Sequence, residues 1–174
     1  MEDVEEDGNS RLPTLLEVPS LDMPALVRVI GSANAPLTHA CCTRLVLLIQ
    51  RPGMDETAAA SGALEVLVTA MQTHGAVPEV LAAACEAIAL MCLCSDAHDH
   101  GAMQRRQRAL SAGALPAVVS SLTNHAASND PTGDLLTRGC MALNVLITAH
   151  DSALRQHALA LGADVGWLPP AQQT

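Results

Sequence analysis

The chain has 174 residues, of which 49% are hydrophobic, so it can bury a core as one globular unit or as a short array of repeats. Its formal net charge is −9 and its nine basic residues are all arginines, most of them scattered, so nucleic acid is not an expected partner. No apolar stretch approaches the roughly 20 residues of a membrane span, and we expect an intracellular protein without membrane insertion, either cytoplasmic or nuclear.

The two ends differ in composition from the middle of the chain. Five of the first seven residues are Glu or Asp, which predicts a disordered acidic tail over residues 1–12. A repeat domain is expected over residues 13–168, beginning with a short helical turn at 13–17. Residues 169–174, which start with Pro169-Pro170, are expected to form a C-terminal tail.

Apolar residues recur at the helical spacing through most of the repeat domain. Proline in a first turn and Gly or Pro after a last turn mark the helix ends. The expected helices cover 21–30, 36–50, 55–60, 63–74, 78–94, 104–112, 114–124, a long segment from Asp130-Pro131 to about 150, and 153–161. The fold class is therefore predicted to be all-α.

One short motif divides the chain into units. Ser61-Gly62-Ala63-Leu64 returns as Ala112-Gly113-Ala114-Leu115 and more weakly as Leu161-Gly162-Ala163-Asp164, at spacings of 113 − 62 = 51 and 162 − 113 = 49 residues. A fixed period in this range is typical of stacked repeats. The predicted repeats cover 21–52, 53–102, 103–151 and a partial unit at 152–168, and the glycine is expected to form a sharp corner between helices.

Each unit reads as a short helix, a glycine, a medium helix and a long helix, and this order resembles the armadillo repeat. The segments Arg106 to Gly113 and Arg155 to Gly162, each with arginine seven residues before glycine, are similar to the first-helix pattern of that family. The resemblance implies a right-handed α-solenoid of about three repeats with incomplete terminal units. It also implies a non-catalytic adaptor or scaffold that binds a segment of a partner protein along its concave face.

The long helices superpose on Cys42, Cys85 and Cys140. The resemblance implies that a small residue lies here because neighbouring third helices pack closely. In family members that bind basic peptides, Trp often follows this position and Asn often lies four residues further on. This chain has neither Trp nor Asn at those positions. The predicted partner-binding residues of the concave face are Thr43, Leu47, Glu86, Leu90, Met141 and Val145.

The last unit lacks a third helix, which leaves Leu159, Leu161, Trp167 and Leu168 without a partner helix. This end is predicted either to fold back or to dock onto another chain, including a second copy. The alternative function is accordingly that of a constitutive structural subunit of a larger assembly, held through this end.

Other residue groups suggest weaker hypotheses. Arg105, Arg106, Arg108 and Arg138 form either a basic patch for acidic groups or a solvated helix face. Cys92 and Cys94 precede three potential ligands, Asp96, His98 and His100, but residues two apart on a helix point in different directions, so we expect a buried Cys92 and no metal site. No hydrolase elbow or phosphate-binding glycine loop occurs, and we expect no enzymatic activity and no cofactor.

Overall fold

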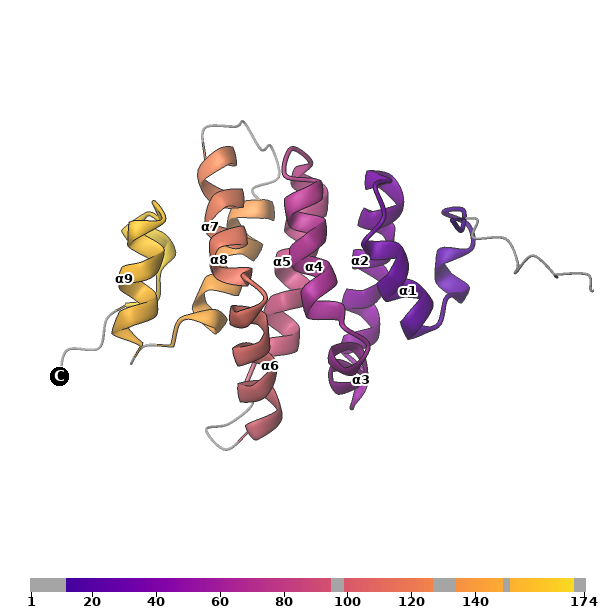
Figure 1. Cartoon of the computed structure of the whole chain (residues 1–174), viewed down its shortest axis with the longest axis horizontal. Helices are drawn as coiled ribbons and strands as arrows, with labels where there is room; N and C mark the ends of the chain where they lie inside the picture. Colours follow the sequence, from indigo (N-terminus) through magenta and orange to yellow (C-terminus); the bar gives the residue numbers. More distant parts are fainter. Residues whose placement is uncertain (1–11, 95–98, 127–133, 149–150, 171–174) are drawn as a thin grey trace, which may run out of the picture.

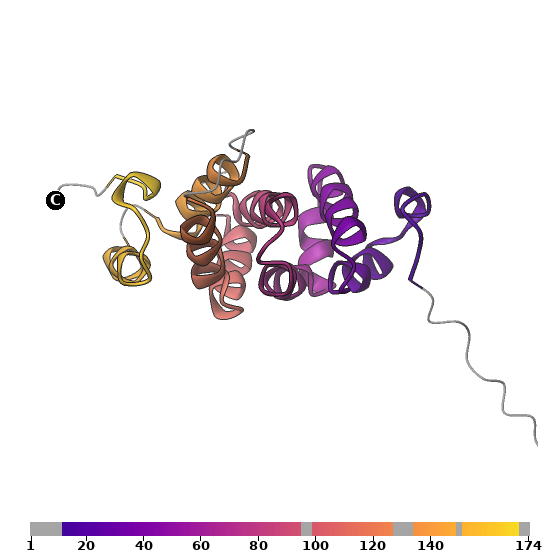
Figure 2. The same ribbon diagram turned by 90° about the horizontal axis from the view of Figure 1, so that it is seen from above.

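The computed structural model describes residues 12–94, 99–126, 134–148 and 151–170. These residues form helices joined by turns and contain no β-strand, which confirms the all-α prediction. Figure 1 shows the helices side by side along one long axis, and the view from above in Figure 2 shows the same elongated row.

The helices fall into successive groups along the chain. A short 3-10 helix and a pair of α-helices open the row, two groups of three helices occupy its centre, and one α-helix with a final 3-10 helix closes it. The elements are η1 (Val18–Ser20), α1 (Met23–Ile30), α2 (Ala35–Ile49), α3 (Met54–Ala60), α4 (Ala63–Thr73), α5 (Pro78–Cys92), α6 (His100–Ser111), α7 (Ala114–His125), α8 (Asp134–Leu146), α9 (Ser152–Ala160) and η2 (Val165–Trp167).

Two layers run along the row. Helices α1, α4 and α7 form one layer, and α2, α5 and α8 form the other. Each helix contacts the next helix of its own layer, and α5 packs against both α2 and α8. We refer to α2, α5 and α8 as the long helices.

Local sequence explains where several helices begin. The side chains of Asp22, Asn34, Asp99 and Asp151 each accept a hydrogen bond from a backbone N–H in the first turn of the helix that follows. Such caps satisfy donors that have no partner within the helix. Proline lies in the first turn of α1, α2 and α5, where its missing N–H costs nothing.

The repeated glycines form the expected corners. Gly62, Gly113 and Gly162 have φ angles of 85°, 91° and 96°, and Gly62 and Gly113 immediately precede α4 and α7. This left-handed conformation is unfavourable for a residue with a Cβ atom. The glycine therefore turns the chain between the first and second helices of a unit.

The burial of the long helices agrees with their superposition on cysteine. Cys42 and Cys85 are buried, and Cys140 is partly buried. Leu45, Ile88 and Leu143, each three residues further on, are all completely buried. Equivalent residues in the three helices therefore face the same core.

Two histidines at equivalent positions connect consecutive groups. His74 and His125 each lie 12 residues after a corner glycine, since 74 − 62 = 12 and 125 − 113 = 12. Their Nε2 atoms lie 2.9 Å from the carbonyl oxygens of Ser32 and Gly75, respectively. Because a carbonyl oxygen only accepts, each Nε2 carries the hydrogen and donates it. His74 thereby contacts the turn before α2, and His125 contacts the turn before α5.

Some predicted bounds were wrong. The expected turn at 13–17 contains a hydrogen bond from the Glu17 N–H to the Thr14 carbonyl at 3.0 Å, but the 3-10 helix itself lies after it at Val18–Ser20, where Val18 is buried. Helix α6 begins at His100 rather than 104, because Asp99 caps it one turn earlier. Helix α8 ends at Leu146 rather than near 150, and the expected cap at Asp130-Pro131 lies outside the described residues.

Candidate functional site

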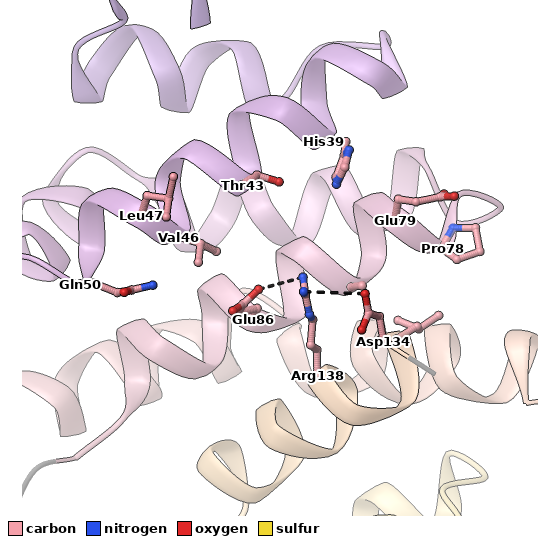
Figure 3. A pocket seen from close by; sticks show the side chains of 12 residues that line it. His39, Thr43, Val46, Leu47, Gln50, Pro78, Glu79, Glu86, Asp134 and Arg138 are labelled. Atoms are coloured by element: carbon pink, nitrogen blue, oxygen red, sulfur yellow. Dashed lines mark ion pairs between the residues drawn. The ribbon is translucent and has the colours of Figure 1, made fainter. Parts of the chain in front are cut away.

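A groove of about 550 Å³ crosses the middle of the row and is bordered by all three long helices. Figure 3 shows side chains from α2 on one side, α5 beneath and α8 on the other side. Its lining residues are His39, Thr43, Val46, Leu47, Gln50, Pro78, Glu79, Ala82, Glu86, Asp134, Leu135 and Arg138.

Apolar side chains form the base of the groove and part of its rim. Val46, Ala82 and Leu135 are buried, whereas Leu47 is 56% exposed. An exposed leucine beside a buried apolar base offers contact area to an apolar side chain of another molecule.

Charged side chains lie beside this apolar area. The Arg138 Nη1 atom lies 2.8 Å from Glu86 Oε2, and its Nη2 atom lies 3.8 Å from Asp134 Oδ2 (Figure 3). Glu79 is exposed at the rim. The groove is lined by three carboxylates and one guanidinium, so the charges of its acidic and arginine side chains sum to 1 − 3 = −2.

The structure separates the six predicted concave-face residues into two sets. Thr43, Leu47 and Glu86 line the groove. Leu90 and Val145 are half-buried and pack against the core, and Met141 is exposed on α8 outside the groove. The six predicted concave-face residues therefore do not form one continuous surface.

Several residues that line the groove were not predicted from the sequence. His39 and Gln50 lie four residues before Thr43 and three after Leu47, and Glu79 lies seven before Glu86. These spacings place each on the same helix face as a predicted residue. Extending each predicted position by one or two turns would have found them.

The C-terminal end folds back in part. Leu168 is buried, Trp167 is partly buried, and Arg155 donates a hydrogen bond to the Pro169 carbonyl. Leu159 and Leu161 remain exposed. The structure thus shows the folded-back arrangement for Trp167 and Leu168 but leaves the two leucines of the predicted docking surface uncovered.

The four arginines of the predicted basic patch do not form one surface: only Arg105 and Arg108 line a common pocket, and each of the four pairs with acidic residues of its own. Arg105 is 7% exposed and pairs with Asp55 at 2.6 Å, and its Nε donates to the Met91 carbonyl at 2.6 Å. The remaining pairs join Arg106 to Asp151, Arg108 to Glu65, and Arg138 to Glu86 and Asp134. These arginines connect helices instead of forming one cationic surface.

The two cysteines that were considered as metal ligands differ in burial. Cys92 is buried and Cys94 is exposed, so the two sulfur atoms face different surroundings. Burial raises the pKa of Cys92 to about 12. Asp96 and His98 lie outside the described residues, and no group of three or more potential metal ligands occurs within the part of the chain that the structure describes.

No protein-family model, curated protein or solved structure matches this sequence. Among the described helices, none combines the length and the apolar character that crossing a bilayer requires. The armadillo resemblance therefore rests on the residues of the chain itself.

Proposed function

We propose that this chain is a non-catalytic protein-interaction module, an armadillo-like array whose groove across α2, α5 and α8 binds a segment of a partner protein. The helical order of the units, the corner glycines and the packing of each long helix on the next support the array. The single observation that supports binding is the groove itself, in which the exposed Leu47 lies beside a net negative charge.

The charge of the groove determines the chemistry of the proposed partner. Its three carboxylates outnumber the one guanidinium, so a Lys or Arg side chain of the partner is attracted and a Glu or Asp is repelled. Leu47 and the buried base accept an apolar side chain. The proposed ligand is therefore an extended segment in which an apolar residue lies close to one basic residue.

A selection from random displayed peptides tests this proposal with the intact chain. We expect the enriched sequences to combine an apolar residue with Lys or Arg. Leu47→Glu and Glu79→Lys should each weaken the enriched peptides about ten-fold, the equivalent of about 1.4 kcal/mol. Leu93→Glu is the matched control, because Leu93 is about as exposed as Leu47 but lies outside the groove.

Two results would contradict the groove proposal. One is a selection that yields no enriched sequence. The other is an enriched peptide whose affinity is the same for the wild-type chain and for both groove variants.

A structural subunit held through the C-terminal end is the second candidate function. The exposure of Leu159, Leu161 and Val165 on the last group of helices favours it. Glu substitutions at these three positions should leave peptide binding in the groove unchanged, and they should release the chain from any assembly with which it co-purifies.

A further inference from the structure

The three carboxylates of the groove are not equivalent partners for a basic residue of a ligand. Glu86 and Asp134 flank Arg138, whose Nη1 atom lies 2.8 Å from Glu86 Oε2 and whose Nη2 atom lies 3.8 Å from Asp134 Oδ2. Glu79 is exposed, and within the described residues it forms no ion pair. The carboxylate that binds the ligand decides how the ligand lies in the groove.

Arg138 already occupies Glu86. The two residues belong to α8 and α5, which pack against each other, so the guanidinium is held beside the carboxylate by the fold itself. Their side chains are 33% and 28% exposed, so water screens the pair and its contribution to stability is small. A ligand cation must nevertheless displace a tethered guanidinium, which has a high effective concentration at this carboxylate. Glu86 is therefore a poor partner for a basic residue of a ligand.

Glu79 and Glu86 lie at different distances from Leu47 along the groove. The superposition of α2 and α5 on cysteine, at an offset of 85 − 42 = 43, places Glu86 at the height of Thr43 along the helix axes. The same offset places Glu79 at the height of Pro36. Because a helix rises about 1.5 Å per residue, Leu47 lies about 6 Å along the axis from Glu86 (47 − 43 = 4 residues) and about 16 Å from Glu79 (47 − 36 = 11 residues). Figure 3 shows Leu47 and Glu79 toward opposite ends of the groove, with Glu86 between them.

From these observations we infer that the basic residue of the ligand binds Glu79, because Arg138 occupies Glu86. The inference rests on the proposed function of the groove and adds a spacing to it. An extended peptide advances about 3.3 Å per residue, so a basic residue at Glu79 lies about five positions from an apolar residue at Leu47. At Glu86 it would lie about two positions away. Arg138 therefore determines the spacing of the recognised segment.

Peptide selections on the intact chain and on two variants test this role of Arg138. The wild-type chain should enrich peptides in which an apolar residue and Lys or Arg are about five positions apart. Arg138→Met removes the tethered cation and leaves Glu86 open to a ligand, so this variant should also enrich peptides with a spacing of about two positions. Arg138→Gln replaces Arg138→Met if the latter does not give the wild-type circular dichroism spectrum.

The matched control is the double variant Arg138→Met/Glu86→Gln, which removes both charges of the pair. It should restore the wild-type spacing of about five positions. Asp134 also loses its cation in both variants, but it corresponds to Glu79 at the offset between α5 and α8 (140 − 85 = 55 and 134 − 79 = 55). Its release from Arg138 therefore does not change the expected spacing.

Binding affinities locate the basic residue directly. The probe is the most enriched wild-type peptide, labelled with fluorescein, and its analogue has norleucine in place of the basic residue. Fluorescence anisotropy should show that norleucine weakens binding about five-fold or more in the wild-type chain and in Arg138→Met/Glu86→Gln. In Glu79→Gln the same replacement should weaken binding less than about two-fold.

Three results would overturn this inference alone. These are a wild-type spacing of about two positions or no preferred spacing, an unchanged spacing in Arg138→Met, and a norleucine effect that Glu79→Gln retains but Arg138→Met/Glu86→Gln loses. In each case a peptide that Leu47→Glu weakens still binds in the groove, so only the position of its basic residue is wrong. If no peptide is enriched, or if Leu47→Glu binds the peptide as the wild-type chain does, the groove proposal and this inference both fail.

Discussion

At the scale of single residues, burial determines the chemistry of the thiols. Burial raises the pKa of Cys42 and Cys85 to about 12, and the neighbouring thiols Cys41 and Cys140 add a smaller contribution in the same direction. Burial alone raises the pKa of Cys41 to about 11 and also raises that of Cys140. Because the thiolate is the nucleophile, these side chains are poor targets near neutral pH.

Alkylation with iodoacetamide at pH 8 should therefore follow exposure. We expect Cys94 to react first and Cys140 more slowly, while Cys41, Cys42, Cys85 and Cys92 react only after denaturation. A raised pKa leaves less thiolate at pH 8, and burial also blocks access. Peptide mass spectrometry over a time course measures this order, and rapid native labelling of Cys85 would contradict it.

Equivalent residues can have different exposures, which explains why only some of the predicted concave-face residues line the groove. Leu47, Leu90 and Val145 occupy the same position on the three long helices. Leu90 and Val145 are half-buried, since a long helix precedes α5 and α8. Leu47 is exposed because no long helix precedes α2. The repeat pattern gives the position, and the neighbours in space decide its exposure.

At the scale of elements, the corner glycines position the helices. Gly113→Ala should reduce the free energy of unfolding by about 1–2 kcal/mol, because alanine must adopt the left-handed φ of 91° found there. Gly75→Ala is the control: its φ is not positive, and the nearest atom to an added Cβ, the Met71 carbonyl oxygen, lies 3.6 Å away. Urea titration measures the free energy of unfolding of both variants. Equal stability of the two variants would contradict this role of Gly113.

The arginines also act between elements. Arg105 connects α6 with Asp55 of α3 and with the carbonyl of Met91 near the end of α5. Arg106 connects α6 with the Leu146 carbonyl at the end of α8, at 2.9 Å. The sequence shows an arginine cluster, but only the packing shows that its members reach different helices.

At the scale of the whole molecule, stability should decrease from the centre of the row toward its C-terminal end. Helix α5 contacts α2 and α8 and buries 11 of its 15 residues, whereas α9 buries only Ala158. In a linear array each unit is stabilised mainly by its neighbours, so a helix with few buried contacts opens at a lower free energy.

Hydrogen exchange followed by mass spectrometry tests this gradient. The backbone amides of α5 should exchange most slowly among the long helices, and those of α9 should exchange fastest among the α-helices of eight or more residues. Exchange in α9 should also be faster than in α1, which is similar in length but buries five residues. Equal protection of α9 and α5 would show that the row unfolds as one cooperative unit.

The sequence by itself determined the helices of the described residues, because the signals for them are local. Helical spacing, first-turn prolines and the recurring glycine predicted every α-helix, and the cysteine superposition predicted which sides of the long helices share a core. Only the tertiary structure decided which residues are accessible and which charges pair. Contacts such as Arg138 with Glu86 join residues 52 positions apart (138 − 86 = 52), and the exposure of a side chain such as Leu47 depends on which neighbour is present.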